Sequence, residues 1–291
     1  MNKCGILELM EKGRILILPG VYDALTAKIA EKTGFQAIVM GGYSISATRL
    51  GQPDVGYLTM SEMCSQIKII SDATNIPLIA DGDTGYGNPM NVMRTIREYE
   101  MSGASGIILE DQQWPKRCGH LEGKQIIPME EHIKKIEAAL EARSDKNFII
   151  IARTDSLKSH GLNEAIRRGN AYRDAGADVV FIEAPQSIEE LRIIPKAIKD
   201  IPIAVSLIEG GKTPLLSSKN LEGMGFSLLF FGLTALFIVA RAWMDALLRL
   251  KKEGSPKGLL ERMITFHDFN ELMGIKDFLD LEERFKISGV S

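Results

Sequence analysis

The chain has 291 residues, of which 45% are hydrophobic and 25% charged, and its net charge at pH 7 is −3. This composition is ordinary for a globular enzyme, and the length suits one barrel of roughly 250 residues with an extension. The slight acidic excess argues against a general nucleic-acid-binding protein, because no surplus of basic side chains is left to neutralise phosphates.

The cysteine pattern and the N-terminus both favour a cytoplasmic enzyme. The three cysteines, Cys4, Cys64 and Cys118, are far apart, and no CxxC pair occurs. Neither a zinc site nor a disulfide framework is therefore indicated, and a reducing compartment is expected. Charged residues interrupt the first apolar residues too early for a signal peptide.

Eight short apolar runs alternate with segments of helical periodicity. The predicted strands are 15–18, 37–40, 77–80, 106–109, 148–152, 179–182, 201–207 and 227–231. The predicted helices between them include 23–33, 60–74, 90–102, 129–142, 162–175 and 188–199. Several of these helices end in a glycine shortly before the next strand, namely Gly34, Gly103 and Gly176.

Strict alternation of strand and helix predicts parallel strands with covering helices. Eight such units favour a (β/α)8 barrel over the alternative, a doubly wound open sheet. No linker or low-complexity tract divides the chain, so we expect one domain over residues 1–291, including a C-terminal helical extension.

The most apolar stretch, residues 226–244, is the one candidate for a membrane span. Arg241 interrupts it, and Gly232 and Thr234 split it into an expected strand and an expected helix. Spanning a bilayer needs roughly 20 uninterrupted apolar residues, so we expect no membrane insertion. The charged helical tail after residue 251 carries apolar side chains that could pack on its own barrel or on a neighbouring subunit: Phe266, Phe269, Leu272, Met273, Phe278, Leu279 and Phe285.

Acidic residues, one arginine and several glycines follow the predicted strands, where the active site of such a barrel lies. The residues at these positions are Gly41, Gly42, Tyr43, Ser44, Asp81, Asp83, Glu110, Asp111, Arg153, Asp155, Glu183, Ser206 and Glu209. Any one acid could instead cap the N-terminus of the following helix. The whole set favours a catalytic site, because capping does not require acids on the strand ends themselves.

Three of these acids predict a divalent metal site. Asp81 and Asp83 would share a face of an extended strand, and Glu110 ends the next strand. An oxygen-rich site without histidine or thiolate suits Mg²⁺, with Mn²⁺ as the alternative. Arg153 could then bind a substrate carboxylate through two hydrogen bonds.

Cys118 lies between Lys116-Arg117 and Gly119-His120, in a setting that favours a reactive thiol. Nearby cations and an imidazole would stabilise the thiolate over the thiol. The alternative is that it is a small buried hydrophobic residue, which is the interpretation for Cys64 and Cys4. With no second histidine nearby, His120 is expected to position the thiol rather than bind metal.

Several motifs together resemble the isocitrate lyase/phosphoenolpyruvate mutase superfamily over nearly the whole chain. They are DGDTGYG at 81–87, EDQQWPKRCGH at 110–120, IARTD at 151–155, GQPD at 51–54 and EGGKTP at 209–214. The KRCGH run is specific to the lyase branch, because the mutases typically lack its cysteine. Trp114-Pro115 and the EGGKTP run favour the branch of dimethylmalate lyases, oxaloacetate hydrolases and petal death proteins over methylisocitrate lyases.

The resemblance implies a role for each site residue. Mg²⁺ would be held mainly through water by Asp54, Asp81, Asp83 and Glu110. The substrate carboxylate would lie beside Gly41, Gly42 and Tyr43. Arg153, Gly119, His120, Glu183 and Ser206 would line the substrate pocket. The loop that carries Cys118 would close over the site. Two departures concern substrate identity: Gly41 stands where Ser or Thr is common, and Ser206 stands where Asn is usual.

The resemblance also implies an activity and an assembly. The expected reaction is Mg²⁺-dependent retro-aldol cleavage of a 2-alkylmalate, such as 2,3-dimethylmalate, to pyruvate and a carboxylic acid. Cys118 would protonate the leaving carbanion, and Tyr43 or a water would act as base. The alternatives are methylisocitrate lyase, oxaloacetate hydrolase, phosphonopyruvate-type or carboxyphosphonoenolpyruvate mutase chemistry, and a non-catalytic dicarboxylate-binding barrel. The expected assembly is a homotetramer whose subunits exchange the last barrel helix.

Overall fold

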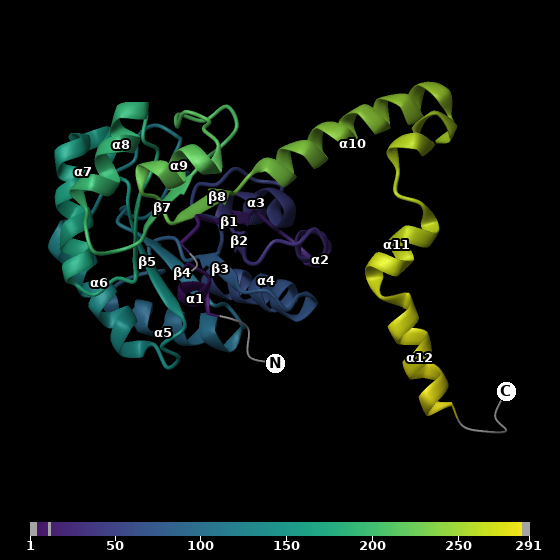
Figure 1. Ribbon diagram of the computed structural model, residues 1–291, viewed down its shortest axis with the longest axis horizontal. Helices are drawn as coiled ribbons and strands as arrows, with labels where there is room; N and C mark the ends of the chain where they lie inside the picture. Colours follow the sequence, from purple (N-terminus) through teal and green to yellow (C-terminus); the bar gives the residue numbers. More distant parts are fainter. Residues whose placement is uncertain (1–4, 11–12, 287–291) are drawn as a thin grey trace. The chain divides into compact units, whose positions relative to one another are not determined.

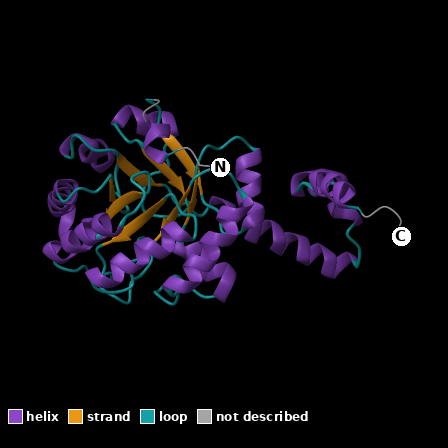
Figure 2. Ribbon diagram, turned by 90° about the horizontal axis from the view of Figure 1, so that it is seen from below, coloured by secondary structure: helices purple, strands orange, loops and turns teal. Residues whose placement is uncertain are grey.

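The computed structural model describes residues 5–10 and 13–286. Cys4 lies outside these residues. The described chain forms the predicted (β/α)8 barrel, shown from two directions in Figures 1 and 2. Its strands are β1 Leu16–Pro19, β2 Ile38–Met40, β3 Leu78–Asp81, β4 Gly106–Glu110, β5 Ile149–Thr154, β6 Val179–Ile182, β7 Ile203–Ser206 and β8 Leu228–Phe231. Each of the eight predicted strands is thereby confirmed to within a few residues.

All seven strand pairings are parallel, and β1 pairs with β8. Between β1 and β2 the ladder is reduced to one bridge, Gly20 to Val39, so the barrel is nearly closed. Parallel order brings the carboxyl end of every strand to the same rim.

Helices α2 to α9 lie around the sheet, as the strand–helix alternation predicted. The α-helices of the described residues are α1 Ile6–Met10, α2 Ala24–Lys32, α3 Gly42–Ile45, α4 Met60–Ala73, α5 Pro89–Met101, α6 Met129–Ala142, α7 Ser156–Asp174, α8 Ile188–Ala197, α9 Ser218–Met224, α10 Thr234–Glu253, α11 Phe266–Met273 and α12 Ile275–Phe285. A π-helical turn, Ser46–Leu50, and a 3-10 helix, Lys257–Arg262, complete the helical segments. Helices α1, α3 and α9 and the π-helical turn were not among the predicted helices.

The residues at the two ends of α5 explain where this helix begins and ends. The side chain of Asn88 accepts hydrogen bonds from the N–H groups of Met90 and Asn91, and Pro89 occupies the first turn of α5. Gly103, which follows the C-terminal end of this helix, has a φ of 93°. Other residues rarely adopt this left-handed conformation, so the predicted glycine stop is confirmed here.

The barrel interior is apolar at its N-terminal end and polar at its C-terminal end. Ile6 and Leu9 of α1 are buried in the same cluster as the interior side chains of the strands, which include Leu18, Ile149 and Phe181. Helix α1 thereby closes one end, and the polar groups gather at the other.

The contacts divide the chain into two compact units, residues 1–236 and 237–291. In the first unit, helices α2 to α9 each bury side chains against the strands or their neighbours. Helices α10, α11 and α12 bury none. Among the described residues, no helix has both the length and the apolarity that a membrane crossing needs.

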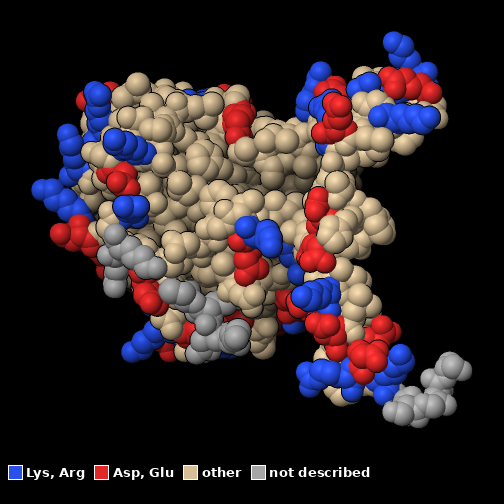
Figure 3. Space-filling view, turned by 45° about the vertical axis from the view of Figure 1, so that its right-hand side comes forward, with Lys and Arg blue, Asp and Glu red and all other residues tan. Residues whose placement is uncertain are grey.

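Exposed charges of both signs lie beside one another on the face shown in Figure 3. This mixture agrees with the near balance of 35 basic and 38 acidic residues in the sequence.

Candidate active site

A cavity of about 80 Å³ opens among the strand ends at the polar rim of the barrel. It brings together most of the predicted site residues from five strand ends and two loops. The predicted residues that line it are Gly41, Gly42, Tyr43, Asp54, Asp81, Cys118, Gly119, Arg153, Glu183 and Ser206. Asp83, Glu110 and His120 lie just behind these residues and contact them or Lys116.

Lys116 joins two of the predicted metal-binding acids. Its Nζ lies 2.6 Å from Asp54 Oδ1 and 2.7 Å from Asp83 Oδ1, and all three side chains are almost fully buried. Because the acids surround it, the pKa of Lys116 is raised despite its burial. The expectation that this lysine stabilises a thiolate at Cys118 is wrong, because its ammonium pairs with the two acids.

Asp81 orders the loop that follows β3. Its Oδ2 accepts a hydrogen bond from the Gly42 N–H, and its Oδ1 accepts one from the Asp83 N–H, both at 3.0 Å. The chain turns sharply here, since Asp83 has a φ of 47°. The expectation of extended backbone through Asp83 is therefore wrong, although the two carboxylates still lie close together.

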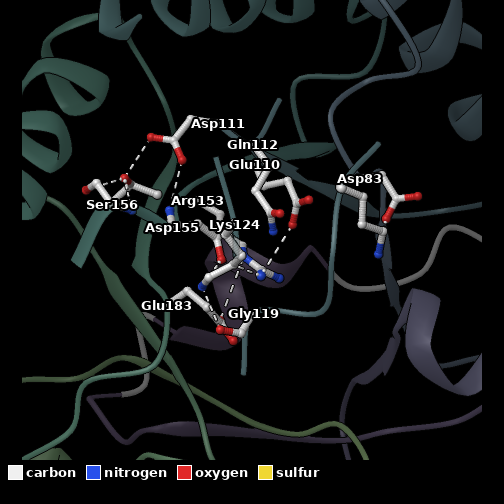
Figure 4. A network of polar contacts seen from close by, with 12 residues as sticks. Asp83, Glu110, Asp111, Gln112, Gly119, Lys124, Arg153, Asp155, Ser156 and Glu183 are labelled. Atoms are coloured by element: carbon white, nitrogen blue, oxygen red, sulfur yellow. Dashed lines mark hydrogen bonds and ion pairs between the residues drawn. The ribbon is translucent and has the colours of Figure 1, made fainter. Parts of the chain in front are cut away.

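Arg153 is the centre of a second group of acids, drawn in Figure 4. Its Nε and Nη2 donate hydrogen bonds of 2.9 and 3.0 Å to the two carboxylate oxygens of Asp155. Nη2 also lies 3.3 Å from Glu110 Oε2, and Nε lies 3.8 Å from Glu183 Oε2. Asp155 precedes α7, yet its side chain makes no capping hydrogen bond, which excludes helix capping as its role.

His120 links the loop to two strand ends. Its Nδ1 accepts a hydrogen bond of 3.0 Å from the Lys212 N–H, and its Nε2 lies 3.3 Å from Glu183 Oε1. An imidazole nitrogen that accepts carries no proton, so the ring proton lies on Nε2, facing Glu183. These contacts are to Lys212 and Glu183, so the expectation that His120 positions the thiol of Cys118 stays a prediction.

Burial and the nearby carboxylates Asp54 and Glu183 together raise the pKa of the Cys118 thiol to about 11, which favours the protonated form at neutral pH. The prediction of a thiolate is thus wrong for two reasons. Lys116 turns toward Asp54 and Asp83, and Arg117 donates to the carbonyl of Glu122 at the surface. A buried thiol of high pKa is suited to donating a proton.

Some buried carboxylate oxygens have no hydrogen-bond partner: Asp83 Oδ2, Glu110 Oε1 and Glu183 Oε2. Burial raises the pKa of Asp83 to about 7 and that of Glu110 well above its usual range. Within the described residues, however, no three His, Cys, Asp or Glu side chains converge closely enough to hold an ion directly. The unpaired oxygens fit a hydrated cation held through water.

Four buried charged residues in and behind the site were missed or unassigned: Lys116, Lys124, Asp111 and Asp155. Their types gave little signal, because a lysine or aspartate in a loop is usually solvated. Only their burial and pairing in the structure reveal them.

The chain matches a known family over most of its length. The family model for phosphoenolpyruvate phosphomutase matches residues 6–251. The chain is 43% identical to 2,3-dimethylmalate lyase of Eubacterium barkeri over 96% of each chain. It is 46% identical to petal death protein of Dianthus caryophyllus, covering 98% of this chain and 90% of the other. It is also 46% identical to a chloroplastic carboxyvinyl-carboxyphosphonate phosphorylmutase of Arabidopsis thaliana, covering 95% of this chain and 83% of the other.

Solved structures lead to the same family. A crystal structure of 2,3-dimethylmalate lyase superposes with a TM-score of 0.90 at 35% identity, over 97% of this chain and 96% of the other. Phosphonopyruvate hydrolase in complex with oxalate and Mg²⁺ superposes with a TM-score of 0.86 at 30% identity, over 95% and 96%. The chain therefore belongs to the phosphoenolpyruvate mutase/isocitrate lyase superfamily, and it is an enzyme of the carbon–carbon lyase class that the sequence predicted.

Proposed function

We propose that this enzyme cleaves a 2-alkylmalate, such as 2,3-dimethylmalate, into pyruvate and a carboxylic acid. The observation that carries the proposal is the Cys118 thiol, with its pKa raised to about 11, in the wall of the cavity that Asp81 and Arg153 also line. Retro-aldol cleavage leaves a carbanion on the departing acid, and a positioned proton donor completes the reaction.

We propose that Asp54, Asp81, Asp83 and Glu110 hold Mg²⁺ through water. The unpaired oxygens of Asp83 and Glu110 support this, and Mn²⁺ is the alternative ion. When bound, the ion would lower the pKa of the substrate hydroxyl and neutralise charge on the pyruvate fragment.

The protein residues would bind and orient the substrate. A Cβ atom on Gly41 would meet no other described residue within 4 Å, so this glycine leaves the backbone open to a carboxylate, whereas the Gly42 N–H already donates to Asp81 Oδ2. Burial raises the pKa of Tyr43, which keeps its phenol protonated and able to donate a hydrogen bond rather than accept a proton. Arg153 would supply the opposite positive charge, and Glu183 and His120 would hold the inner wall.

The cavity favours a substrate with two carboxylates and an alkyl group. Its remaining wall is apolar, formed by Val39, Ile108, Phe181, Phe230 and Leu233. Among the described residues that line it, the cations are Lys116 and Arg153, and both are already paired with acids. A third carboxylate, as in methylisocitrate, would meet no further cation there, and burying an unpaired charge is costly.

The test is a panel of substituted malates, methylisocitrate, oxaloacetate and phosphonopyruvate, with and without Mg²⁺, read as 2-keto acid formation by a coupled dehydrogenase. We expect pyruvate from the alkylmalates, and loss of activity in EDTA that Mg²⁺ restores. Cys118→Ser should lower the rate roughly 100- to 10,000-fold, the range of general acid catalysis. Cys64→Ser is the matched control. No turnover of any alkylmalate, or near-full activity of Cys118→Ser, would contradict the proposal.

We also propose the predicted homotetramer with an exchanged helix. Helix α10 buries no residue of its own, and its large apolar side chains Ile238, Trp243, Met244 and Leu248 are each more than half exposed. Apolar surface of this extent favours association between subunits. Light scattering of the purified enzyme should give the mass of four chains, and Trp243→Glu should reduce it.

A further inference from the structure

Lys124 makes two short, buried contacts that the proposed chemistry does not use. Its Nζ donates a hydrogen bond of 2.6 Å to the carbonyl of Gly119 and one of 2.7 Å to Asp155 Oδ1. The side chain of Lys124 is only 4% exposed, and that of Asp155 is fully buried. A lysine gives up its hydration at such a site only where charge and hydrogen bonds replace it.

The two partners of Lys124 belong to different parts of the site. Gly119 follows Cys118 in segment 116–124, which we name the gate. Asp155 follows β5 and binds the Arg153 guanidinium with both carboxylate oxygens. Lys124 therefore connects the backbone beside the thiol to the carboxylate that orients the arginine, as the dashed lines in Figure 4 show.

Asp155 is a rigid anchor for this connection. Its N–H donates a hydrogen bond of 2.8 Å to Asp111 Oδ1, which ties it to the layer behind the sheet. The positive charges of Arg153 and Lys124 hold the pKa of Asp155 well below its usual range, against the effect of burial. It stays ionised and can attract Lys124 at any physiological pH.

The gate is closed against the cavity in this arrangement. A Cβ atom on Gly119 would lie only 2.3 Å from Glu183 Oε1 and 2.5 Å from Arg153 Nη2, so the backbone touches the inner wall directly. The next contacts along the gate are His120 with Glu183 and Lys212. At its surface, Glu122 pairs with Lys158 and Lys212, but Glu122 is 72% exposed and such pairs contribute little.

We propose that Lys124 is a positioning residue that latches the gate onto the barrel, so that the Cys118 thiol is held at the cavity. Only the purpose of this contact, delivery of the thiol to the substrate, rests on the proposed function. The effect of Lys124 on the fraction of time that the gate is open does not depend on it.

The test measures gate opening without turnover. Cys118 is alkylated with iodoacetamide, and the modified peptide is quantified by mass spectrometry in wild type, Lys124→Met, Lys124→Arg and Lys158→Met. Loss of a hydrogen-bonded charge pair should raise the open fraction, so we expect Lys124→Met to label roughly tenfold faster than wild type. Lys124→Arg keeps the charge and should label within about threefold of wild type. Lys158→Met removes only an exposed pair with the gate and should label at the wild-type rate.

Catalysis gives a second readout. In Lys124→Met, kcat for the alkylmalate should fall more than KM rises, because Arg153 keeps Asp155 and still binds the carboxylate while the thiol is delivered less often. A merely structural role would lower the thermal transition and leave kcat per folded enzyme unchanged.

Labelling of folded Lys124→Met within about twofold of wild type would overturn the latch, as would an equal rise in Lys158→Met. If Lys124→Met does not fold, Lys124→Gln keeps a donor for Gly119 but loses the ion pair, and it must label at least about fivefold faster than wild type. Because labelling needs no substrate, an inactive wild-type enzyme would count against the lyase proposal alone.

Discussion

Two neighbouring acids at the end of β4 lie in two different buried charged clusters: Glu110 is the last residue of the strand, and Asp111 follows it. Asp111 accepts four hydrogen bonds, from the N–H of Asp155, the hydroxyls of Thr154 and Tyr172, and Nη1 of Arg168. Glu110 faces the barrel interior, lies 3.3 Å from Arg153 Nη2 and leaves Oε1 without a partner. Figure 4 shows the two side chains pointing in different directions from adjacent residues.

The hydrogen bonding of the two side chains distinguishes a structural acid from one that is suited to binding a ligand. Burial does not distinguish them, because both side chains are at most 2% exposed. The difference is whether the carboxylate oxygens have hydrogen-bond partners. The cluster around Asp111 completes its hydrogen bonds and supports the fold, whereas the cluster around Glu110 keeps unpaired oxygens for something that binds.

The largest effect is expected from Asp111→Asn. The amide cannot accept all four hydrogen bonds, and among the described residues it leaves buried Arg168 with Glu164 as its one acidic hydrogen-bond partner. Breaking a buried ion pair from one side costs about 3–5 kcal/mol, which we expect as a loss in the free energy of unfolding by urea. Asp174→Asn on the surface of α7 is the control, since its carboxylate is 66% exposed. A loss below about 1 kcal/mol, the size of an ordinary hydrogen bond, would show that Asp111 is not structural.

Glu110→Gln should have the opposite effects: it should lower activity and leave stability intact. The neutral amide removes a charge whose burial raises the pKa of the acid, and Arg153 retains Asp155 and Glu183. We therefore expect the free energy of unfolding to be unchanged or higher. Alkylmalate cleavage should fall roughly 100-fold, as is typical when one preorganised charge is lost from an active site. A loss of unfolding free energy as large as that of Asp111→Asn would show that Glu110 also stabilises the fold, and it would contradict the distinction between the two clusters.

The sequence predicted the barrel and the rim because both depend on repeated local patterns. Eight apolar runs with helical segments between them leave few other topologies, and glycine stops such as Gly103 mark the helix ends. Once the strands are placed, Asp81, Glu110, Arg153 and Glu183 must meet at one rim.

The partners of individual side chains could not be predicted in the same way. Lys116 precedes Cys118 by two residues, yet its ammonium reaches Asp54, which is 62 residues away in the chain. Proximity in sequence therefore suggested an activated thiol where the fold provides a protonated one. Glu110 and Asp111 look equivalent in the sequence, and only the alternation of side chains along β4 sends them into different clusters.

The smallest expected effect concerns His132, which packs behind the sheet near the cluster of Asp111. Its ring centre lies 4.7 Å from that of Tyr172, and its side chain is fully buried. Burial, together with the positive charges of Lys135 and Arg168, lowers the pKa of His132 to about 3. The folded protein therefore keeps this imidazole neutral at pH values where the unfolded chain binds a proton.

The direction in which stability changes with pH follows from the difference in bound protons between the unfolded and folded states. Between pH 6.5 and about pH 3 the unfolded state holds one more proton at His132, so stability falls as pH falls. From pH 7 to pH 5 wild type should lose about 2 kcal/mol more unfolding free energy than His132→Phe, which has no proton to bind. His267→Gln, at an exposed position of α11, should follow wild type. Wild type and His132→Phe would lose stability in parallel if the His132 ring were accessible to water or bound to an acid. That result would contradict a lowered pKa for this imidazole.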